Sequence, residues 1–583
     1  MSDAGHPQSS PFIIGVSGHR NLQSGCESEL RARVRDFLRT LKSHLPHTEL
    51  RIMIGMAQGA DLLVAQVGIE ENIGIEAMLP MPLAEYVKDF EPDSAALLQV
   101  VLENALVRCS IAPALIHSGA GDVLRDTLYA NLTEVLIQKS SLMLALWDGE
   151  TSVLPGGTAD TLLRYLGARS VEGDEQSDIA MVGAGAEPAW GPNFAYWIPT
   201  SRSDTPDPPP SGAKYLSGVG ENLLAVHDTM PQALSGQLRE LDAYNSEFER
   251  LAASDLGARR DSLMTELPPD LARADRDALG RIDTEYGKAD ALAIYYQQRS
   301  DRLFQLFSFL AGLMACVFLV YAKLIASKVL LTTYLLVLAV GFALFYWVRG
   351  RHWFTKHLLF RVLAETMRSQ FFLRVAGADR FVNVAELINL SGVDRFSGFS
   401  WIGIVVKSVQ PVEAPQRALE RSSRMALEWV HKQWIGGQQS YFRRRVKRLE
   451  ETHDRLHHVK SSVLAIVALL AILLALFSKE LNTHHMGTAS GKDIVIFTMG
   501  LLSVWLGIWE LYENKMATRE LLWQYRNQLS HFARADLRLS RNGTRHRYAA
   551  VAILAEVGKE SLMESYLWAI HRYHREHEPP AGA

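Results

Sequence analysis

The chain has 583 residues and a mass of 65.1 kDa, the length of about three or four ordinary domains, which disfavours a single hydrophobic core. Lysine and arginine total 60 and aspartate and glutamate total 64, so a formal charge of -4 gives no overall positive field and disfavours a dedicated nucleic-acid-binding protein. Cys26, Cys109 and Cys316 are far apart in the sequence, which fits neither a disulfide framework nor a zinc site.

The first 200 residues contain short apolar runs that end in glycine-rich turns, a pattern that predicts strands followed by helices. The predicted strands are 12–16, 50–54 and 141–146, and the predicted helices are 27–44 and 62–71. Strands that alternate with helices form a parallel sheet with helices on both faces. The predicted fold class of this region is therefore α/β and Rossmann-like.

The turns after these strands are the candidate ligand-binding elements. In an open parallel sheet, ligands bind beyond the carboxyl ends of the strands, where the three turns would lie together. Glycine allows a phosphate to approach the backbone, and the helix after each turn offers unpaired N–H groups to an anion. Ser17, His19 and Arg20 can add donors. Asp61 and Asp148 can accept hydrogen bonds from ribose hydroxyls.

Each of these residues also has an ordinary structural alternative. A glycine turn after a strand is common, and His19 and Asp61 can cap the helices that follow them. Three residues of LPMPLAEYVKDF are interpreted as packing residues: Tyr86, Asp89 and Phe90. A further glycine turn at 154–158 brings the number of such turns to four, which favours a binding site.

A proline-rich polar stretch at 199–214 ends this module, because such a sequence continues neither a helix nor a strand. The predicted division of the chain is a ligand-binding domain at 1–200, a linker at 201–215, a helical coupling segment at 216–302, a first hairpin with its trailing helix at 303–390, a connector at 391–440 and a second hairpin with trailing helices at 441–583.

Four uncharged apolar runs lie in the second half of the chain, at 303–322, 329–348, 461–478 and 494–509. About 20 helical residues cross roughly 30 Å of hydrocarbon, and the short connections pair the runs into two transmembrane hairpins. Aromatic residues near the run ends suit the headgroup layer: Tyr321, Tyr346, Trp347, Trp505 and Trp509. The alternative, four buried helices of a soluble protein, is disfavoured by two such runs back to back.

Basic residues flank the runs on one side: Arg299, Arg302, Arg349, Arg351, Lys356 and the stretch 443–448. By the positive-inside rule, this predicts a multi-pass membrane protein with both termini in the cytoplasm, and no signal peptide is recognised. Long helices of mixed spacing follow the hairpins, at 355–374 and 516–539, which suggests a loose duplication with faces for self-association. The alternative is that any membrane hairpin has basic flanks.

The motifs IIGVSGHRNL, IGMAQGADLLVA, LPMPLAEYVKDF and ALWDGETSVLPGGTADTL, within about 11–200, resemble the SLOG superfamily of Rossmann-like domains, which is related to the LOG phosphoribohydrolases, DprA and the N-terminal region of TRPM channels. The hairpins and trailing helices from about 280 onward resemble the SLATT family. The resemblance implies a sensor of a nucleotide or NAD-derived signal fused to a membrane effector of a bacterial antiviral system. Matched by motif, it implies these ligand contacts: Gly15, Ser17, Gly18, His19, Arg20, Gly55, Gly59, Ala60, Asp61, Asp148, Gly149, Gly156, Gly157 and Thr158.

One departure from the family pattern disfavours catalysis. The LOG enzymes have PGGxGTxxE with a glutamate used in hydrolysis, and that position is Leu163 in this sequence. The resemblance therefore implies a binding protein of the bacterial inner membrane that forms a pore or other assembly, with the lipid bilayer and further copies of itself as partners. Four uncharged spans cannot line a water-filled route alone, so a homo-oligomer is expected.

Two alternatives stay open at this point. The first is a membrane-tethered nucleotide or NAD hydrolase that uses Asp61, Asp148 or Asp160, and the second is a membrane scaffold with a vestigial site. No cofactor, metal or nucleic acid is expected. His571, His574 and His577 share a three-residue spacing but are interpreted as part of a solvated tail.

Overall fold

The computed structural model describes residues 9–111, 121–150, 156–168, 180–183, 193–203, 212–252, 262–384, 387–388, 399–411, 423–486, 489–516, 518–542 and 546–576. The chain forms two compact units. The first comprises 1–291, 361–426 and 558–572, and the second comprises 292–360, 427–557 and 573–583. Each unit is therefore assembled from segments that are far apart in the sequence.

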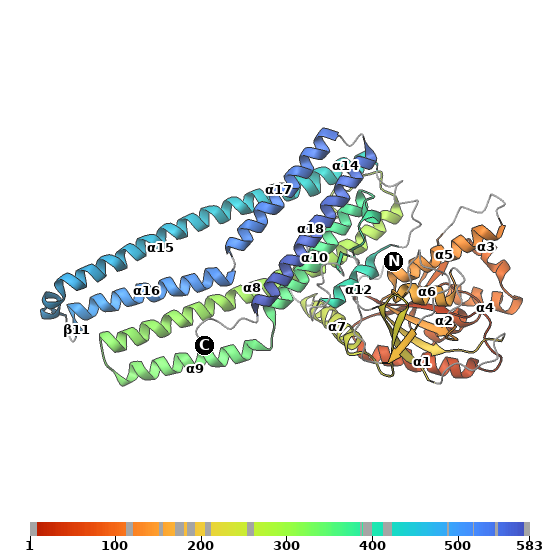
Figure 1. The fold of residues 1–583 in the computed structure, drawn as a ribbon, viewed down its shortest axis with the longest axis horizontal. Helices are drawn as coiled ribbons and strands as arrows, with labels where there is room; N and C mark the ends of the chain where they lie inside the picture. Colours follow the sequence, from red (N-terminus) through yellow and green to blue (C-terminus); the bar gives the residue numbers. More distant parts are fainter. Residues whose placement is uncertain are drawn as a thin grey trace. The chain divides into compact units, whose positions relative to one another are not determined.

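The first unit contains a sheet whose described strands are nine in number, in the order β4-β3-β2-β1-β5-β7-β8-β9-β6 (Figure 1). Their bounds are β1 (Phe12–Gly18), β2 (Leu50–Ile54), β3 (Gly74–Leu79), β4 (Val107–Ser110), β5 (Leu142–Trp147), β6 (Ala180–Gly183), β7 (Phe194–Pro199), β8 (Lys214–Gly220) and β9 (Leu223–His227). Neighbouring strands are parallel from β4 to β7, and β8 is antiparallel to both β7 and β9. The predicted parallel sheet is confirmed in part, because the sheet is mostly parallel but contains the antiparallel strand β8.

Helices cover this sheet, and their apolar faces explain why they form. Their bounds are α1 (Glu27–His44), α2 (Ala60–Glu70), α3 (Leu83–Tyr86), α4 (Pro92–Glu103), α5 (Gly121–Lys139), α6 (Thr158–Tyr165), α7 (Gln232–Ala252) and α12 (Ser400–Val409). In α1 the buried residues Leu30, Val34 and Phe37 recur at a three- and four-residue spacing, as the sequence predicts. β5 is buried at all of its positions, which is typical of a central parallel strand covered on both faces.

The sheet extends beyond the expected boundary at residue 200. β8 and β9 lie after the proline-rich stretch, in the region where the sequence predicts a linker and then helices. α12, which falls within the predicted connector 391–440, packs against α7, α5 and β1 of the same unit. Lys407 of α12 donates to the Ser140 carbonyl oxygen at 3.2 Å and to Asn193 Oδ1 at 3.1 Å. The predicted connector thus contributes a helix to the sheet domain.

In the described part of the chain, four helices are long and apolar enough to cross a membrane, and their apolar windows are not buried within the protein. They are α8 (Arg273–Lys323), α9 (Lys328–Arg349), α15 (Gly437–Thr483) and α16 (Gly491–Met516). Figure 1 shows α8 and α9 as one long hairpin and α15 and α16 as another. Because Gly500 has no side chain, Leu319 packs closely on it, so α8 and α16 are in contact.

The remaining described elements are distributed along the chain. They are η1 (Val87–Asp89), η3 (Asp379–Phe381), α10 (Trp353–Val375), α14 (Arg424–Val430), a π-helical turn (His431–Gly436), β10 (His485–Met486), β11 (Ala489–Ser490), α17 (Thr518–Asn542) and α18 (Arg547–Glu576). α10 and α17 agree with the predicted trailing helices at 355–374 and 516–539. α15 and α17 pack against each other, and Arg526 of α17 donates to Glu450 of α15 at 3.0 Å.

Candidate functional site

The strand order reverses between β1 and β5, which are neighbours at the centre of the sheet. From β1 the chain builds outward through β2, β3 and β4 on one side, whereas β5 and β7 lie on the other. Gly18 and Leu146 pair at the carboxyl ends of the two strands. In an open sheet, the loops at such a reversal separate and leave room for a ligand. The turns at 17–20 and 147–149 therefore meet where the sequence predicts a site.

His19 and Asp148 join these two turns. The Asp148 backbone N–H donates to His19 Nε2 at 3.0 Å, and Asp148 Oδ1 lies 3.0 Å from the same nitrogen. The Asp148 side chain is only 7% exposed, and its Oδ2 accepts no hydrogen bond from any residue that the structure describes. Arg202 Nη1 is 3.6 Å from Oδ2. An acceptor buried in this way is costly unless a donor reaches it.

The turn after β2 packs directly on the turn after β1. Gly59 has φ +86°, and a Cβ there would lie 2.2 Å from the Arg20 carbonyl oxygen, so only glycine fits. The Ala60 N–H donates to the His19 carbonyl oxygen at 3.1 Å. These contacts fix the backbone of the first turn beside the N-terminus of α2.

Asp61 forms a hydrogen bond within the second turn, the one that follows β2. Its Oδ2 accepts from the Ala57 N–H at 3.1 Å, and burial raises the pKa of the carboxyl group to about 7. The fourth turn is built alike, since Asp160 Oδ2 accepts from the Gly156 N–H at 3.0 Å. Neither His19 nor Asp61 makes the helix N-cap contact that the structural alternative predicts: α1 begins after Cys26 and α2 after Gly59, without a side-chain cap.

Tyr129 of α5 connects the first turn to the fourth. The Arg20 guanidinium lies over its ring, 4.9 Å from the centroid, and Gly156, with φ +77°, packs against its backbone. The Tyr129 hydroxyl donates to Asp89 Oδ2 at 2.7 Å. Tyr129 carries no motif, so sequence reasoning missed it, and the same is true of Arg202.

The packing interpretation of the LPMPLAEYVKDF residues fits what is found. Tyr86 is buried, donates to the Gly55 carbonyl oxygen at 3.0 Å and stacks edge-on against Phe90. Asp89 holds Tyr129 and Arg125. These residues support the turns from behind.

The structure separates some predicted residues from the edge of the sheet that the carboxyl ends of the strands form. Gly15 lies inside β1, where a Cβ would be 1.9 Å from Ser140 Oγ, so its small size serves strand packing. Leu163, at the position of the LOG glutamate, is fully buried in the core. Gly149 lies at the edge with φ +92° and packs on Trp197. Of the turn 154–158, residues 154 and 155 fall outside the described residues.

The remaining predicted positions complete the edge. Ser17 and Gly18 end β1, Gly55 follows β2, and Gly157 and Thr158 begin α6. Together the four turns present two helix N-termini, arginine side chains and a buried acceptor, a set suited to phosphate and hydroxyl groups. Within the described part of the chain, no group of three histidine, cysteine, aspartate or glutamate residues is suited to a metal ion. His577 falls outside the described residues.

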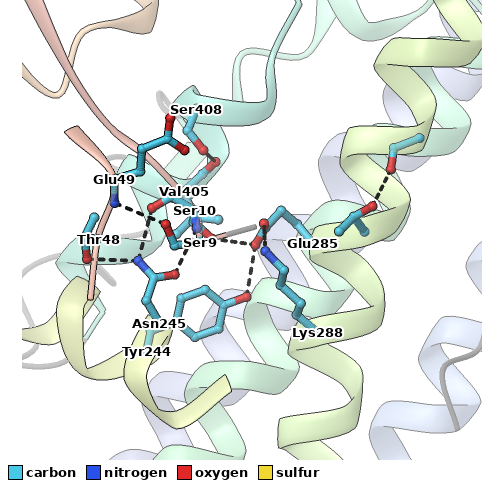
Figure 2. Close-up of polar contacts among 12 residues, drawn as sticks. Ser9, Ser10, Thr48, Glu49, Tyr244, Asn245, Glu285, Lys288, Val405 and Ser408 are labelled. Atoms are coloured by element: carbon cyan, nitrogen blue, oxygen red, sulfur yellow. Dashed lines mark hydrogen bonds and ion pairs between the residues drawn. The ribbon is translucent and has the colours of Figure 1, made fainter. Parts of the chain in front are cut away.

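A buried polar cluster lies at the other edge of the sheet, beside the residues that precede β1 and β2 (Figure 2). Ser10 Oγ donates to Glu285 Oε2 of α8 at 2.7 Å, and the Tyr244 hydroxyl of α7 donates to the same oxygen at 3.1 Å. Lys288, only 1% exposed, is 2.6 Å from Glu285 Oε1. Asn245 donates to the Ser10 carbonyl oxygen at 3.1 Å. Sequence reasoning missed this cluster, which ties α8 to the sheet.

No protein-family model matches the sequence, and no curated protein matches it either.

Proposed function

We propose that this chain is a ligand-controlled membrane effector. Its Rossmann-like, SLOG-like domain binds a nucleotide or NAD-derived signal, and binding changes the association or opening of two transmembrane, SLATT-like hairpins. The setting that the motif resemblance favours is the inner membrane of a bacterium, in defence against viruses.

The observation that carries the proposal is the buried Asp148 Oδ2 at the strand reversal, which faces Arg202 at 3.6 Å but accepts no hydrogen bond from the described residues, in the same chain as four long apolar helices. A ribose hydroxyl can donate to Asp148 Oδ2, and a phosphate suits the N–H groups of α2 and the guanidinium of Arg20. The burial of Asp148 makes the match selective, because a ligand without a donor leaves the acceptor unpaired. Leu163 in place of a glutamate supports binding without hydrolysis.

Ligand binding shifts an equilibrium only through different affinities for its two states. A 100-fold preference for one state corresponds to about 2.7 kcal/mol, which is enough to convert a minor state into the major one. α8 carries both Glu285, which is bound to the sheet domain, and the first apolar run, so it is the element that would transmit the change.

The test has two stages on the full chain in detergent and then in dye-loaded vesicles. Calorimetry with adenine nucleotides and ADP-ribose should detect a ligand, and Asp148→Asn should weaken its binding about tenfold or more, because the acceptor becomes a donor. Asp228→Asn, on an aspartate that pairs with Lys214 at the surface, is the matched control and should bind normally. The same ligand should then release dye from vesicles that contain the wild-type chain.

Two results would contradict the proposal. Equal binding by Asp148→Asn and wild type would mean that the ligand does not bind at Asp148. Binding without any change in leakage or oligomeric state would favour the scaffold alternative. Release of a free base from the bound ligand would favour the hydrolase alternative.

A further inference from the structure

A hollow of about 100 Å³ lies on the surface of the second unit, between α15 and α17. It is lined by His453, Arg519, Leu522, Trp523 and Arg526. The described lining therefore contains two guanidinium groups and an imidazole but no carboxylate. The Trp523 side chain is 70% exposed, an unusual state for a large aromatic ring in contact with water alone.

The hollow lies close to the end of the apolar runs. His453 precedes the run that begins at Ser461 by eight residues, which is roughly 12 Å along a helix. Arginine stems are long enough to carry a guanidinium over roughly half of that distance. The basic stretch 443–448 lies on the same helix, farther from the run. This places the hollow at the level where a cytoplasmic juxtamembrane segment meets lipid headgroups.

Three glutamates near the hollow form ion pairs with basic residues. Glu450 accepts from Arg526, an ion pair that also fixes α17 against α15. Glu510 and Glu513, near the end of α16, both bind Lys460. Arg519 makes no hydrogen bond or ion pair with a side chain that the structure describes. The lining of the hollow therefore offers the Arg519 guanidinium to an anion.

We propose that this hollow binds the phosphate of an anionic phospholipid headgroup. Arg519 supplies the main contact, Arg526 adds charge while it stays paired with Glu450, and the Trp523 ring lies among the headgroups with Leu522 facing the acyl side. The inference goes beyond the nucleotide site, since it requires only that the hairpins are in a bilayer. It assigns a lipid-binding role to the helical segments that precede and follow the second hairpin.

The experiment is native mass spectrometry of the full chain in detergent, titrated with phosphatidylglycerol or with phosphatidylcholine. Wild-type protein should retain phosphatidylglycerol preferentially, and Arg519→Gln should weaken that retention about fivefold, the effect of one arginine near a lipid surface. Trp523→Ala should weaken it as well. Arg541→Gln removes the same charge from an exposed position on α17, 22 residues farther along the helix, and should behave as wild type.

Several outcomes would overturn the inference. Equal losses of phosphatidylglycerol retention in Arg519→Gln and Arg541→Gln would mean that lipid binding depends only on the overall charge of the helix. Competition by millimolar inorganic phosphate, with equal affinity for the free ion and the lipid, would make the hollow a site for soluble phosphate. Arg519→Lys keeps the charge and should retain most of the binding, which separates a local site from misfolding. A lipid result of either kind leaves nucleotide binding at Asp148 unchanged, so the two proposals fail separately.

Discussion

Asp61 is held in a position where its ionised form is unfavourable. An unfolded aspartate titrates near pH 4, whereas burial raises the pKa of Asp61 to about 7. Between these pH values the folded chain binds more protons than the unfolded chain, so the free energy of unfolding falls as the pH rises through that interval. The decrease in the free energy of unfolding across this interval is at most about 4 kcal/mol.

We therefore expect Asp61→Asn to raise the thermal midpoint at about pH 8 and to remove this pH dependence between about pH 4 and 7. The amide oxygen can still accept from the Ala57 N–H, so the turn keeps its hydrogen bond. Asp61→Ala should also flatten the pH profile but lower the midpoint, because that hydrogen bond is lost. Thermal unfolding of the solubilised chain across this range measures both variants, and an unchanged slope in Asp61→Asn would rule out the assignment.

At the scale of single elements, two Glu–Lys pairs at i,i+3 spacing provide a matched comparison. Glu285 and Lys288 of α8 are both buried, whereas Glu85 and Lys88 are on the surface. Removal of one partner of a buried pair leaves an uncompensated charge, while water replaces the partner at the surface. Glu285 of the buried pair also accepts hydrogen bonds from the hydroxyls of Ser10 and Tyr244, which belong to other segments.

We expect Glu285→Gln to destabilise the chain by about 3 kcal/mol or more, since Lys288 loses the counter-charge of Glu285 and the Ser10 and Tyr244 hydroxyls lose a charged acceptor. Glu85→Gln should have little effect, and Glu285→Gln combined with Lys288→Met should recover much of the loss. Thermal unfolding of the three variants is the measurement. A loss in Glu285→Gln no larger than that in Glu85→Gln would mean that the cluster does not hold α8 on the sheet.

At the scale of the whole molecule, the long apolar helices lead to a prediction about topology. If both hairpins span the bilayer as proposed, the turn at 324–327 faces away from the cytoplasm and the sheet domain lies within it. In a cysteine-free background, Ala326→Cys should react with a membrane-impermeant maleimide in intact cells. Ser43→Cys, on the exposed face of α1, should react only after lysis. Labelling of both positions only after lysis would contradict a spanning first hairpin.

Local sequence was sufficient wherever a pattern repeats within one element. The strands at 12–16, 50–54 and 141–146 and the helix at 27–44 were predicted because burial imposes a period on contiguous residues. The four long apolar helices were predicted because length and the absence of charge are properties of the sequence. The glycine turns were also recognisable, since Gly59 and Gly156 adopt positive φ.

The arrangement of these parts was decided only by the tertiary structure. The strand reversal between β1 and β5, the pairing of Asp148 with His19 and Arg202, and the contact of Tyr129 with Arg20 join residues that are far apart in the chain. The same applies to β8 and β9, which extend the sheet beyond a proline-rich stretch, and to Glu285. Periodicity reports which face of an element is buried, but not which other element covers it, because that choice depends on the packing of the whole chain.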